Sequence, residues 1–214
     1  MVLDKHRTKV DPVLSPMAKH LVGINPDVFT WISLVFAFLA GVFFFLSNKT
    51  TELITYSLFI GSFFVFMNGL FDALDGKIAK LSKKVSKRGD FLDHAIDRYA
   101  DVFMVGGLAI STWVHPLIGI LALVGMLLTS YMGTQAQAIG HERDYSGILG
   151  RADRLVLLMI VPIVQHIALR YSLESIWHFT ILEWVLIYFA IMGNITAIQR
   201  FYSTLQWFKK NKGK

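Results

Sequence analysis

The chain has 214 residues, of which 54% are hydrophobic and 14% aromatic, and its formal net charge is +6. Together with a mean hydropathy of +0.52, this composition excludes an ordinary soluble globule and is typical of an integral membrane protein. The positive residues lie at the edges of apolar segments, so nucleic acid is excluded as a partner and anionic lipid or phosphate is favoured. The absence of cysteine excludes disulfides and cysteine-ligated metals.

An N-terminal segment at residues 1–27 precedes the first long apolar run. Within it, residues 11–22 combine apolar positions with Lys19 and His20 at helical spacing, which predicts an amphipathic helix on the membrane surface. An ordered lead-in to the first span fits the same pattern. The Asn-Pro-Asp sequence at 25–27 offers a turn and a helix-start residue, and it predicts where the first transmembrane helix begins.

Six apolar segments follow, each close to the roughly 20 residues that a helix needs to cross a hydrocarbon core of about 30 Å. They occupy approximately residues 28–47, 53–71, 91–113, 116–138, 153–170 and 176–199. We therefore predict an all-α integral membrane protein whose six transmembrane helices form one domain at residues 28–200. A basic C-terminal tail is predicted at residues 201–214.

The distribution of lysine and arginine predicts the orientation of the spans. Four lie in the N-terminal segment, six in the second loop, three at the fourth loop and five toward the C-terminal end, whereas the intervening loops hold only Lys49 and Arg170. Because positive residues in short loops favour the cytoplasmic face, both termini and the second and fourth loops are predicted to be cytoplasmic. The predicted location is the cell membrane.

Carboxylates crowd the segment 72–98, where the second span ends and the third begins. Asp72 and Asp75 are three residues apart, and Asp93 and Asp97 are four apart, so each pair shares one face of a helix. Charged side chains within a span are costly, and like charges held close together repel one another. A lone aspartate at a span end is more often a helix cap or an interfacial residue, but four at this spacing require a cationic partner.

Divalent cations are the simplest partner for these acids. Hard cations take oxygen ligands, and the sequence offers no cysteine or histidine cluster for a softer metal, so Mg²⁺ is the first expectation and Mn²⁺ the second. Carboxylates that bridge two such ions stabilise attacking and leaving oxygens at phosphorus, which predicts phosphoryl-type transfer. Gly76 allows close approach of the backbone to a ligand. His94 points away from the acidic stripe and is predicted to pack or to support the ligands.

The spacing of these acids resembles the signature of the CDP-alcohol phosphotransferases, D-x-x-D-G-x-x-A-R followed by a spacer and G-x-x-x-D-x-x-x-D. The chain reads Asp72-x-x-Asp75-Gly76-x-x-Ala79-Lys80, a spacer of eight residues, and then Gly89-x-x-x-Asp93-x-x-x-Asp97. Seven motif positions match with their spacing intact. The departure is Lys80, which keeps the positive charge of the family arginine but loses its bidentate grip on a pyrophosphate.

The resemblance implies a metal-dependent enzyme that transfers a phospholipid group from a CDP-linked lipid, CDP-archaeol or CDP-diacylglycerol, to an alcohol and releases CMP. It implies that Asp72, Asp75 and Asp93 hold two metal ions, and that Asp97 both contacts metal and removes the acceptor proton. It also implies a homodimer. Because the acids flank the second loop, the active site is predicted to face the cytoplasm.

The resemblance extends to residues expected at the CDP-lipid. Pro26-Asp27-x-x-Thr30 resembles a P-[DN]-x-x-T sequence of the family at the first span, and Ser86 resembles a serine or threonine near the nucleotide. The residues predicted to bind the CDP-lipid are therefore Asp27, Thr30, Gly76, Lys80 and Ser86.

Arg151 and Arg154 lie three residues apart near a helix start, which suits a phosphate dianion, although membrane anchoring is the alternative. The pair resembles the R-x-x-R sequence of phosphatidylinositol phosphate and archaetidylinositol phosphate synthases, which implies inositol phosphate as the acceptor. The fourth span departs from the bacterial enzymes, with Gly133 and Gln135 in place of lysine and arginine. Gln135 and Gln137 are therefore candidates for binding hydroxyl groups.

Three other interpretations compete with this one. The same chemistry with glycerol 3-phosphate or serine as acceptor keeps the metal site, although the two arginines weigh against serine. An ion or proton transporter would also place acids within spans, but the sequence lacks broken spans in two matching halves. A non-enzymatic membrane scaffold would give the clustered acids no role.

Overall fold

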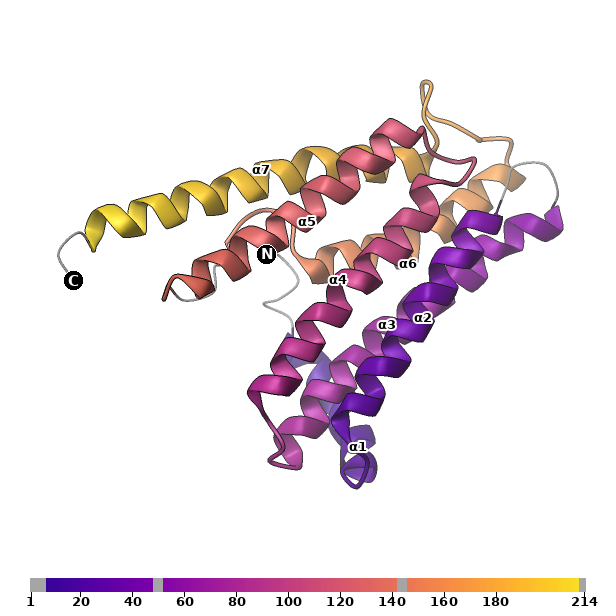
Figure 1. Cartoon of the computed structure of the whole chain (residues 1–214). Coiled ribbons are helices and arrows are strands. Elements are labelled where there is room, and N and C mark those ends of the chain that lie inside the picture. The colour runs from indigo at the N-terminus through magenta and orange to yellow at the C-terminus, as the bar shows by residue number, and fades with distance from the viewer. Residues whose placement is uncertain (1–6, 48–51, 142–145, 212–214) are drawn as a thin grey trace.

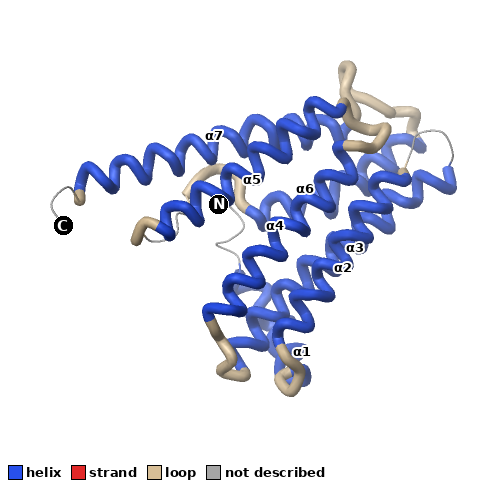
Figure 2. The backbone as a smooth tube through the Cα atoms, viewed as in Figure 1, coloured by secondary structure: helices blue, strands red, loops and turns tan. Residues whose placement is uncertain are grey.

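The computed structural model describes residues 7–47, 52–141 and 146–211. Within these residues the regular secondary structure is helical throughout and no strand is present (Figure 1, Figure 2). The helices are α1 (Arg7–Leu21), α2 (Pro26–Leu46), α3 (Glu52–Leu81), α4 (Lys87–Ala109), α5 (Pro116–Ala138), α6 (Arg151–Arg170) and α7 (Ile181–Lys210). The prediction of an all-α protein is confirmed.

The helices form two groups that are joined through α4 and α6 (Figure 1). In the first group, α2 lies beside α3 and α4, α6 packs along α3, and α1 lies against α3. In the second group, α5 and α7 run side by side. The second group meets the first where α5 contacts α4 and α7 contacts α6.

Five helices are long and apolar enough to cross a membrane, judged by length and composition. They are α2, α5, α6, α7 and the part of α3 from Tyr56 to Leu81. The prediction of several membrane-spanning helices is thus confirmed. α4 has 23 residues but carries seven charged side chains, namely Lys87, Arg88, Asp90, Asp93, Asp97, Arg98 and Asp101, and these lower its hydropathy. Its role as a sixth span stays a prediction.

Large apolar side chains cover the outward faces of these helices. Trp31 and Phe38 on α2, Phe63 and Phe66 on α3, and Ile120 on α5 are all exposed. Soluble monomers rarely expose a continuous apolar surface of this kind, whereas hydrocarbon chains solvate it at no cost. The surface therefore agrees with a multi-pass membrane protein.

Small residues allow the helix backbones to approach one another closely. A Cβ atom added at Gly107 of α4 would lie 2.2 Å from the carbonyl oxygen of Gly41 on α2. A Cβ atom added at Gly193 of α7 would lie 2.9 Å from the carbonyl carbon of Gly125 on α5. Such contacts between small residues are how helices pack in the absence of a hydrophobic driving force.

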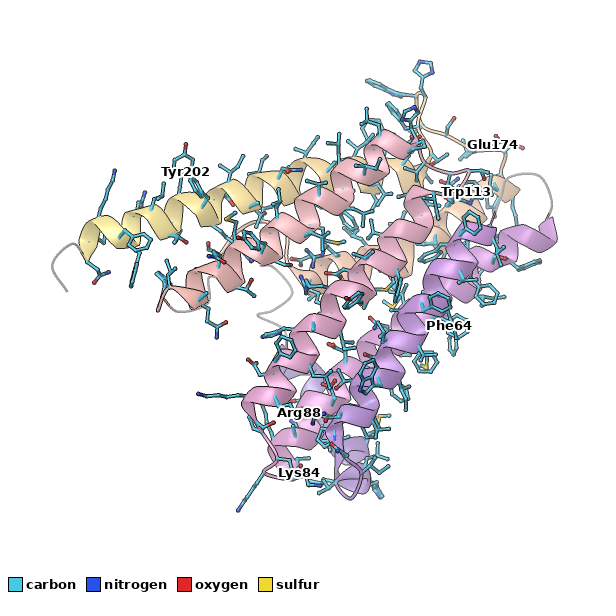
Figure 3. All side chains as sticks on the ribbon, viewed as in Figure 1. Phe64, Lys84, Arg88, Trp113, Glu174 and Tyr202 are labelled. Carbon is cyan, nitrogen blue, oxygen red and sulfur yellow. The ribbon has the colours of Figure 1, made fainter. Side chains whose placement is uncertain are left out.

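Side-chain hydrogen bonds close one end of the bundle. The Trp113 indole donates to the Ser47 hydroxyl at 2.8 Å, the Thr180 hydroxyl donates to the Trp113 carbonyl at 2.9 Å, and the His115 backbone N–H donates to Glu183 at 2.7 Å. Figure 3 shows Trp113 at the end of the molecule opposite Lys84 and Arg88. The predicted site residues lie at the Arg88 end.

The last helix extends into the segment predicted as the basic C-terminal tail. Residues 201–210 continue α7, so the basic tail begins as part of the last helix, and Lys209 and Lys210 lie in its final turn. Positive charge is favourable there because it faces the negative end of the helix dipole. Arg200, predicted to lie near the membrane edge, is 5% exposed and donates to the backbone carbonyls of Ser146 and Thr129.

Candidate functional site

The four predicted acids converge where α3 ends and α4 begins. Carboxylate oxygens of Asp72, Asp75 and Asp93 lie within 4.8 Å of one another, and so do ligand atoms of Asp93, His94 and Asp97. Asp93 belongs to both groups and therefore joins the acids of α3 to those of α4. Asp75 and Asp97 are only 5% and 7% exposed, so half of the cluster is withdrawn from water.

A local cap fixes the position of the α4 acids. Ser86 is the N-cap of α4, and its hydroxyl accepts a hydrogen bond of 3.1 Å from the backbone N–H of Gly89. The cap satisfies one of the free N–H groups at the helix start and begins α4 a few residues after α3 ends. Asp93 and Asp97 then fall on consecutive turns, next to the last turns of α3.

Helix α2 orients one of the acids. The Thr30 hydroxyl donates to Asp75 Oδ2 at 2.6 Å, and both side chains are buried. One turn earlier, Asp27 Oδ2 lies 2.5 Å from Nη1 of Arg88, an exposed residue in the first turn of α4 (Figure 3). Thr30 therefore contacts the acidic cluster directly, and Asp27 links the start of α2 to the start of α4.

Gly76 and Lys80 lie on α3 beyond Asp75. A Cβ atom added at Gly76 would meet no other atom within 4 Å, so open space lies beside the cluster at this point. Lys80 is exposed in the last turn of α3, two turns after Asp72. The residues predicted to bind the CDP-lipid thus come from α2, α3 and the cap of α4, which surround the acids.

The start of α6 places a cation on the carboxylates. Arg151 Nη1 donates to Asp72 Oδ2 at 2.8 Å, and Arg151 Nη2 lies 2.7 Å from Asp97 Oδ1. One guanidinium group therefore bridges an acid of α3 and an acid of α4. The spacing of residues in the sequence did not reveal this contact, because Arg151 and Asp72 are 79 positions apart.

Arg154 and Arg151 contact different acids in the structure. Arg154 Nη2 donates to Asp101 Oδ2 at 2.9 Å, and each of these two side chains is only 2% exposed. Asp101 lies one turn after Asp97 and continues the four-residue spacing of the α4 acids. Arg154 thus contacts a fifth acid that the sequence-based prediction did not use, while Arg151 contacts two of the four that it did.

The contacts of Arg98 were missed from the sequence. The Arg98 guanidinium donates to the Ser130 hydroxyl of α5, and it lies 3.5 Å from Asp97 and 3.4 Å from Asp101. His94, predicted to pack or to support the ligands, lies 3.4 Å from Asp90 and 3.6 Å from Asp93. The available signal was Arg98 itself, because an arginine within a span requires an acidic partner.

The donor set of the cluster suits a divalent metal. All four predicted ligands are carboxylates, which offer the oxygen atoms that hard cations prefer. Four carboxylates this close also repel one another unless positive charge lies between them. The cluster is therefore a candidate divalent-metal site, with Arg151 as a neighbouring group able to bind an anion.

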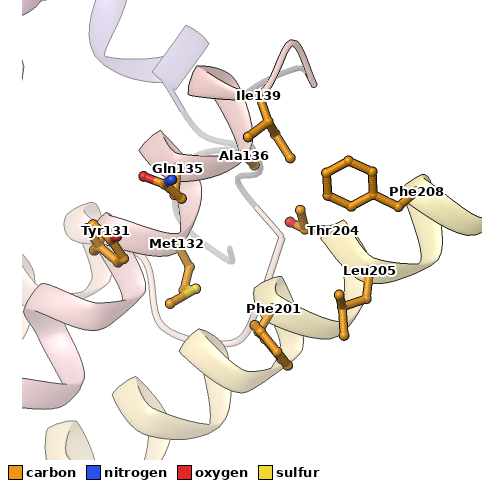
Figure 4. A pocket seen from close by; sticks show the side chains of 9 residues that line it. All are labelled: Tyr131, Met132, Gln135, Ala136, Ile139, Phe201, Thr204, Leu205 and Phe208. Atoms are coloured by element: carbon orange, nitrogen blue, oxygen red, sulfur yellow. The ribbon is translucent and has the colours of Figure 1, made fainter. Parts of the chain in front are cut away.

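Two apolar pockets accompany the site. A pocket of about 210 Å³ lies between α3 and α6 and is lined by Leu14 of α1, by Ala73, which follows Asp72, and by Leu155, which follows Arg154. A larger pocket of about 330 Å³ lies between α5 and α7, includes Gln135, and contains none of the four acids (Figure 4). The smaller pocket is lined by residues that are neighbours in sequence of Asp72 and Arg154.

Comparison with known proteins identifies the family of the chain. The profile of the CDP-alcohol phosphatidyltransferase family matches residues 24–196. The archaetidylinositol phosphate synthase of Pyrococcus horikoshii is 32% identical over 203 residues, which cover 94% of this chain and 95% of that protein. The phosphatidylinositol phosphate synthase of Cutibacterium acnes is 28% identical over 210 residues, which cover 93% of this chain and 95% of that protein.

Solved structures share the fold. The phosphatidylinositol phosphate synthase of Mycobacterium tuberculosis with CDP-DAG bound has a TM-score of 0.69 at 24% identity, covering 90% of this chain and 94% of that chain. Its complex with manganese and citrate has a TM-score of 0.69 at 25% identity, covering 90% of this chain and 88% of that chain. The acidic motif, the helical fold and the match over most of the chain agree, and this multi-pass membrane protein therefore belongs to the CDP-alcohol phosphatidyltransferase family of transferases.

Proposed function

We propose that this enzyme transfers the phospholipid group of a CDP-linked lipid to inositol phosphate and releases CMP, as a step of phospholipid synthesis. The observation that carries the proposal is the contact of Arg151 with Asp72 and Asp97. It joins a group that binds phosphate to the acids predicted to hold metal. The names of the two relatives described above support inositol phosphate as the acceptor.

The four acids are assigned to two divalent ions, with Mg²⁺ as the first expectation and Mn²⁺ as the second. Asp72, Asp75 and Asp93 would hold the ions, and Asp97 would contact one of them. When bound, such ions neutralise the crowded carboxylates and stabilise the charge that develops on the phosphoryl and leaving oxygens. The manganese complex of the M. tuberculosis protein supports a divalent metal. The Thr30 hydroxyl would keep Asp75 in one orientation.

Asp97 is assigned as the general base. It takes the proton of the acceptor hydroxyl while that oxygen forms a bond to the phosphorus that carries the lipid. The bond between this phosphorus and the CMP oxygen breaks, and CMP leaves with the bonding electrons. Asp97 suits this role because it lies beside Arg151, the group assigned to the acceptor phosphate.

The CDP-lipid is assigned to Asp27, Thr30, Gly76, Lys80 and Ser86. The open space at Gly76 would allow the nucleotide to approach the helix backbone, and Lys80 would supply positive charge for the pyrophosphate. The apolar pocket between α3 and α6 suits a lipid chain, because apolar side chains line it, among them Ala73, which follows Asp72 in the sequence.

The acceptor phosphate is assigned to Arg151 and Arg154. Arg151 carries this assignment, because its two terminal nitrogens already point at the acids around the reacting group. Arg154 would have to leave Asp101 before it could contact the phosphate. Gln135 lines the pocket between α5 and α7, so the structure gives no direct support for it as a ligand of the acceptor hydroxyls.

The finer membrane arrangement is also proposed. α4 would be the third of six spans, with α1 on the membrane surface and both termini and the active site on the cytoplasmic side of the cell membrane. Residues 1–27 would form the juxtamembrane segment, residues 28–200 the catalytic domain and residues 201–214 the basic end of the chain. The functional unit would be a homodimer. A charged helix such as α4 is tolerated in a bundle whose interior pairs its acids with arginines.

The test is release of CMP by the purified protein in lipid nanodiscs. Either CDP-archaeol or CDP-diacylglycerol is supplied with Mg²⁺, and inositol phosphate, glycerol 3-phosphate and serine are added one at a time. CMP release that requires inositol phosphate and stops with excess chelator is expected. Release with one of the other two acceptors alone would overturn the assigned acceptor but keep the chemistry. Release that persists in chelator would overturn the metal site.

A further inference from the structure

We propose that Asp101 is a positioning residue for the metal site, which holds Arg154 away from the four metal-binding carboxylates and shares Arg98 with Asp97. This inference rests on the proposed function in requiring that those carboxylates bind a divalent ion. Asp101 has no part in the steps assigned above. It lies on the same face of α4 as Asp93 and Asp97, yet its oxygen contacts arginines from two helices.

The arginine partners of Asp101 distinguish it from the four predicted ligands. The residue is 1% exposed and lies one turn farther along α4 than Asp97, away from the α3 acids. Its Oδ2 accepts a hydrogen bond of 2.9 Å from Arg154 of α6 and lies 3.4 Å from Nη1 of Arg98. A single carboxylate therefore offsets two guanidinium groups inside the protein.

Both arginines lie close enough to the cluster to compete with metal. Arg98 Nη2 is 3.5 Å from Asp97 Oδ2, and Arg98 is the residue next to Asp97 in the sequence. Arg154 follows Arg151 by three positions on α6, so the two side chains project from the same face of that helix. Arg151 already reaches Asp72 and Asp97.

Removing the charge of Asp101 would leave Arg154 buried without its anion. An unpaired buried charge is strongly unfavourable, so Arg154 and Arg98 would be drawn toward the nearest remaining acid, Asp97. They would then occupy carboxylate oxygens or raise the positive potential at the site, and either effect weakens the binding of a divalent cation. Asp101 thus acts on metal binding through the arginines.

A purely structural role makes a different prediction, which allows a decisive test. If Asp101 and Arg154 only hold α4 against α6, then removing either partner lowers stability and leaves the metal affinity of the folded protein unchanged. If Asp101 positions the arginines, Asp101→Asn weakens metal binding and Arg154→Gln does not, and removing both charges restores the metal affinity. The double substitution therefore separates charge balance from helix packing.

The experiment measures Mn²⁺ binding to the protein in nanodiscs, from the electron paramagnetic resonance signal of unbound Mn²⁺. Asp101→Asn is expected to weaken Mn²⁺ binding about tenfold or more, Arg154→Gln not to weaken it, and the double variant to bind within about threefold of wild type. Glu183→Gln is the matched control, since it removes a buried acid at the opposite end of the bundle, and it is expected to leave Mn²⁺ binding unchanged.

An Asp101→Asn variant that binds Mn²⁺ as tightly as wild type would overturn the proposal, and so would a double variant that stays as weak as the single one. If Asp101→Asn does not fold, the double variant decides, because it has no unpaired charge between α4 and α6. If the double variant binds Mn²⁺ about tenfold more weakly than Arg154→Gln does, the inference is overturned. Wild-type protein that binds no Mn²⁺ would instead refute the metal site, and with it the proposed function.

Discussion

Replacing Arg151 tests how the enzyme recognises the second substrate. In the structure, two terminal nitrogens of this side chain lie 2.8 Å from Asp72 and 2.7 Å from Asp97, so its planar fork is held against the carboxylate cluster. A phosphate that accepts hydrogen bonds from the same group gains about 1.5–3 kcal/mol for each bond to a charged partner. Losing one such bond in Arg151→Ala should weaken acceptor affinity by about ten- to a hundredfold.

The assay measures apparent affinity for inositol phosphate and for the CDP-lipid, each at saturating levels of the other substrate. Arg151→Ala should change the first strongly and the second by less than about threefold. Arg151→Lys keeps the charge but not the planar fork, so it should fall between alanine and wild type. Arg170→Ala, at the other end of α6, removes an exposed arginine and should change neither affinity. Arg154→Ala tests whether the second predicted arginine contributes to acceptor binding.

The assignment of Arg151 to the acceptor would be refuted if Arg151→Ala weakened both affinities equally, because the arginine would then serve the donor site or the folded state. It would also be refuted if neither affinity changed, because Arg151 would then be only an anchor at the membrane edge. If only Arg154→Ala weakened the affinity for inositol phosphate, the acceptor phosphate would be reassigned from Arg151 to Arg154.

Three other predictions follow from the geometry. Asp97→Asn should abolish transfer, because the general base is lost, while CDP-lipid binding stays within about threefold of wild type, because only one of several metal contacts is lost. Normal turnover in this variant would disprove the assignment of Asp97 as the base. Thr30→Val should weaken Mn²⁺ binding about tenfold by freeing Asp75, whereas Thr134→Val, whose hydroxyl bonds only within α5, should not. Gly107→Ala should lower the free energy of unfolding by about 1–3 kcal/mol, because its Cβ would meet the Gly41 backbone. Unfolding measured in detergent should show no such loss for Gly106→Ala, where space is open.

The sequence was sufficient for features that depend on one helix at a time. Apolar length predicted α2, α3, α5, α6 and α7, because a span must satisfy its backbone hydrogen bonds internally and therefore must be helical. The pairing of Asp72 with Asp75, and of Asp93 with Asp97, followed from the helical period alone. Even the convergence of the two pairs was predictable, because the short connection between α3 and α4 brings the end of one helix to the start of the next.

Only the tertiary structure decided which partners these acids meet. Arg151 reaches Asp72 across 79 positions, Arg154 reaches Asp101 across 53, and Arg98 turns to Ser130 on α5. The spacing of residues along the sequence carries no information about such contacts, because they depend on how α6 and α5 pack against α4. That packing is set by close approaches between small residues and by the loops at the opposite end of the bundle. The sequence by itself therefore determined which acids share a helix face, and the fold decided that Arg151 contacts Asp72 and Asp97 whereas Arg154 contacts Asp101.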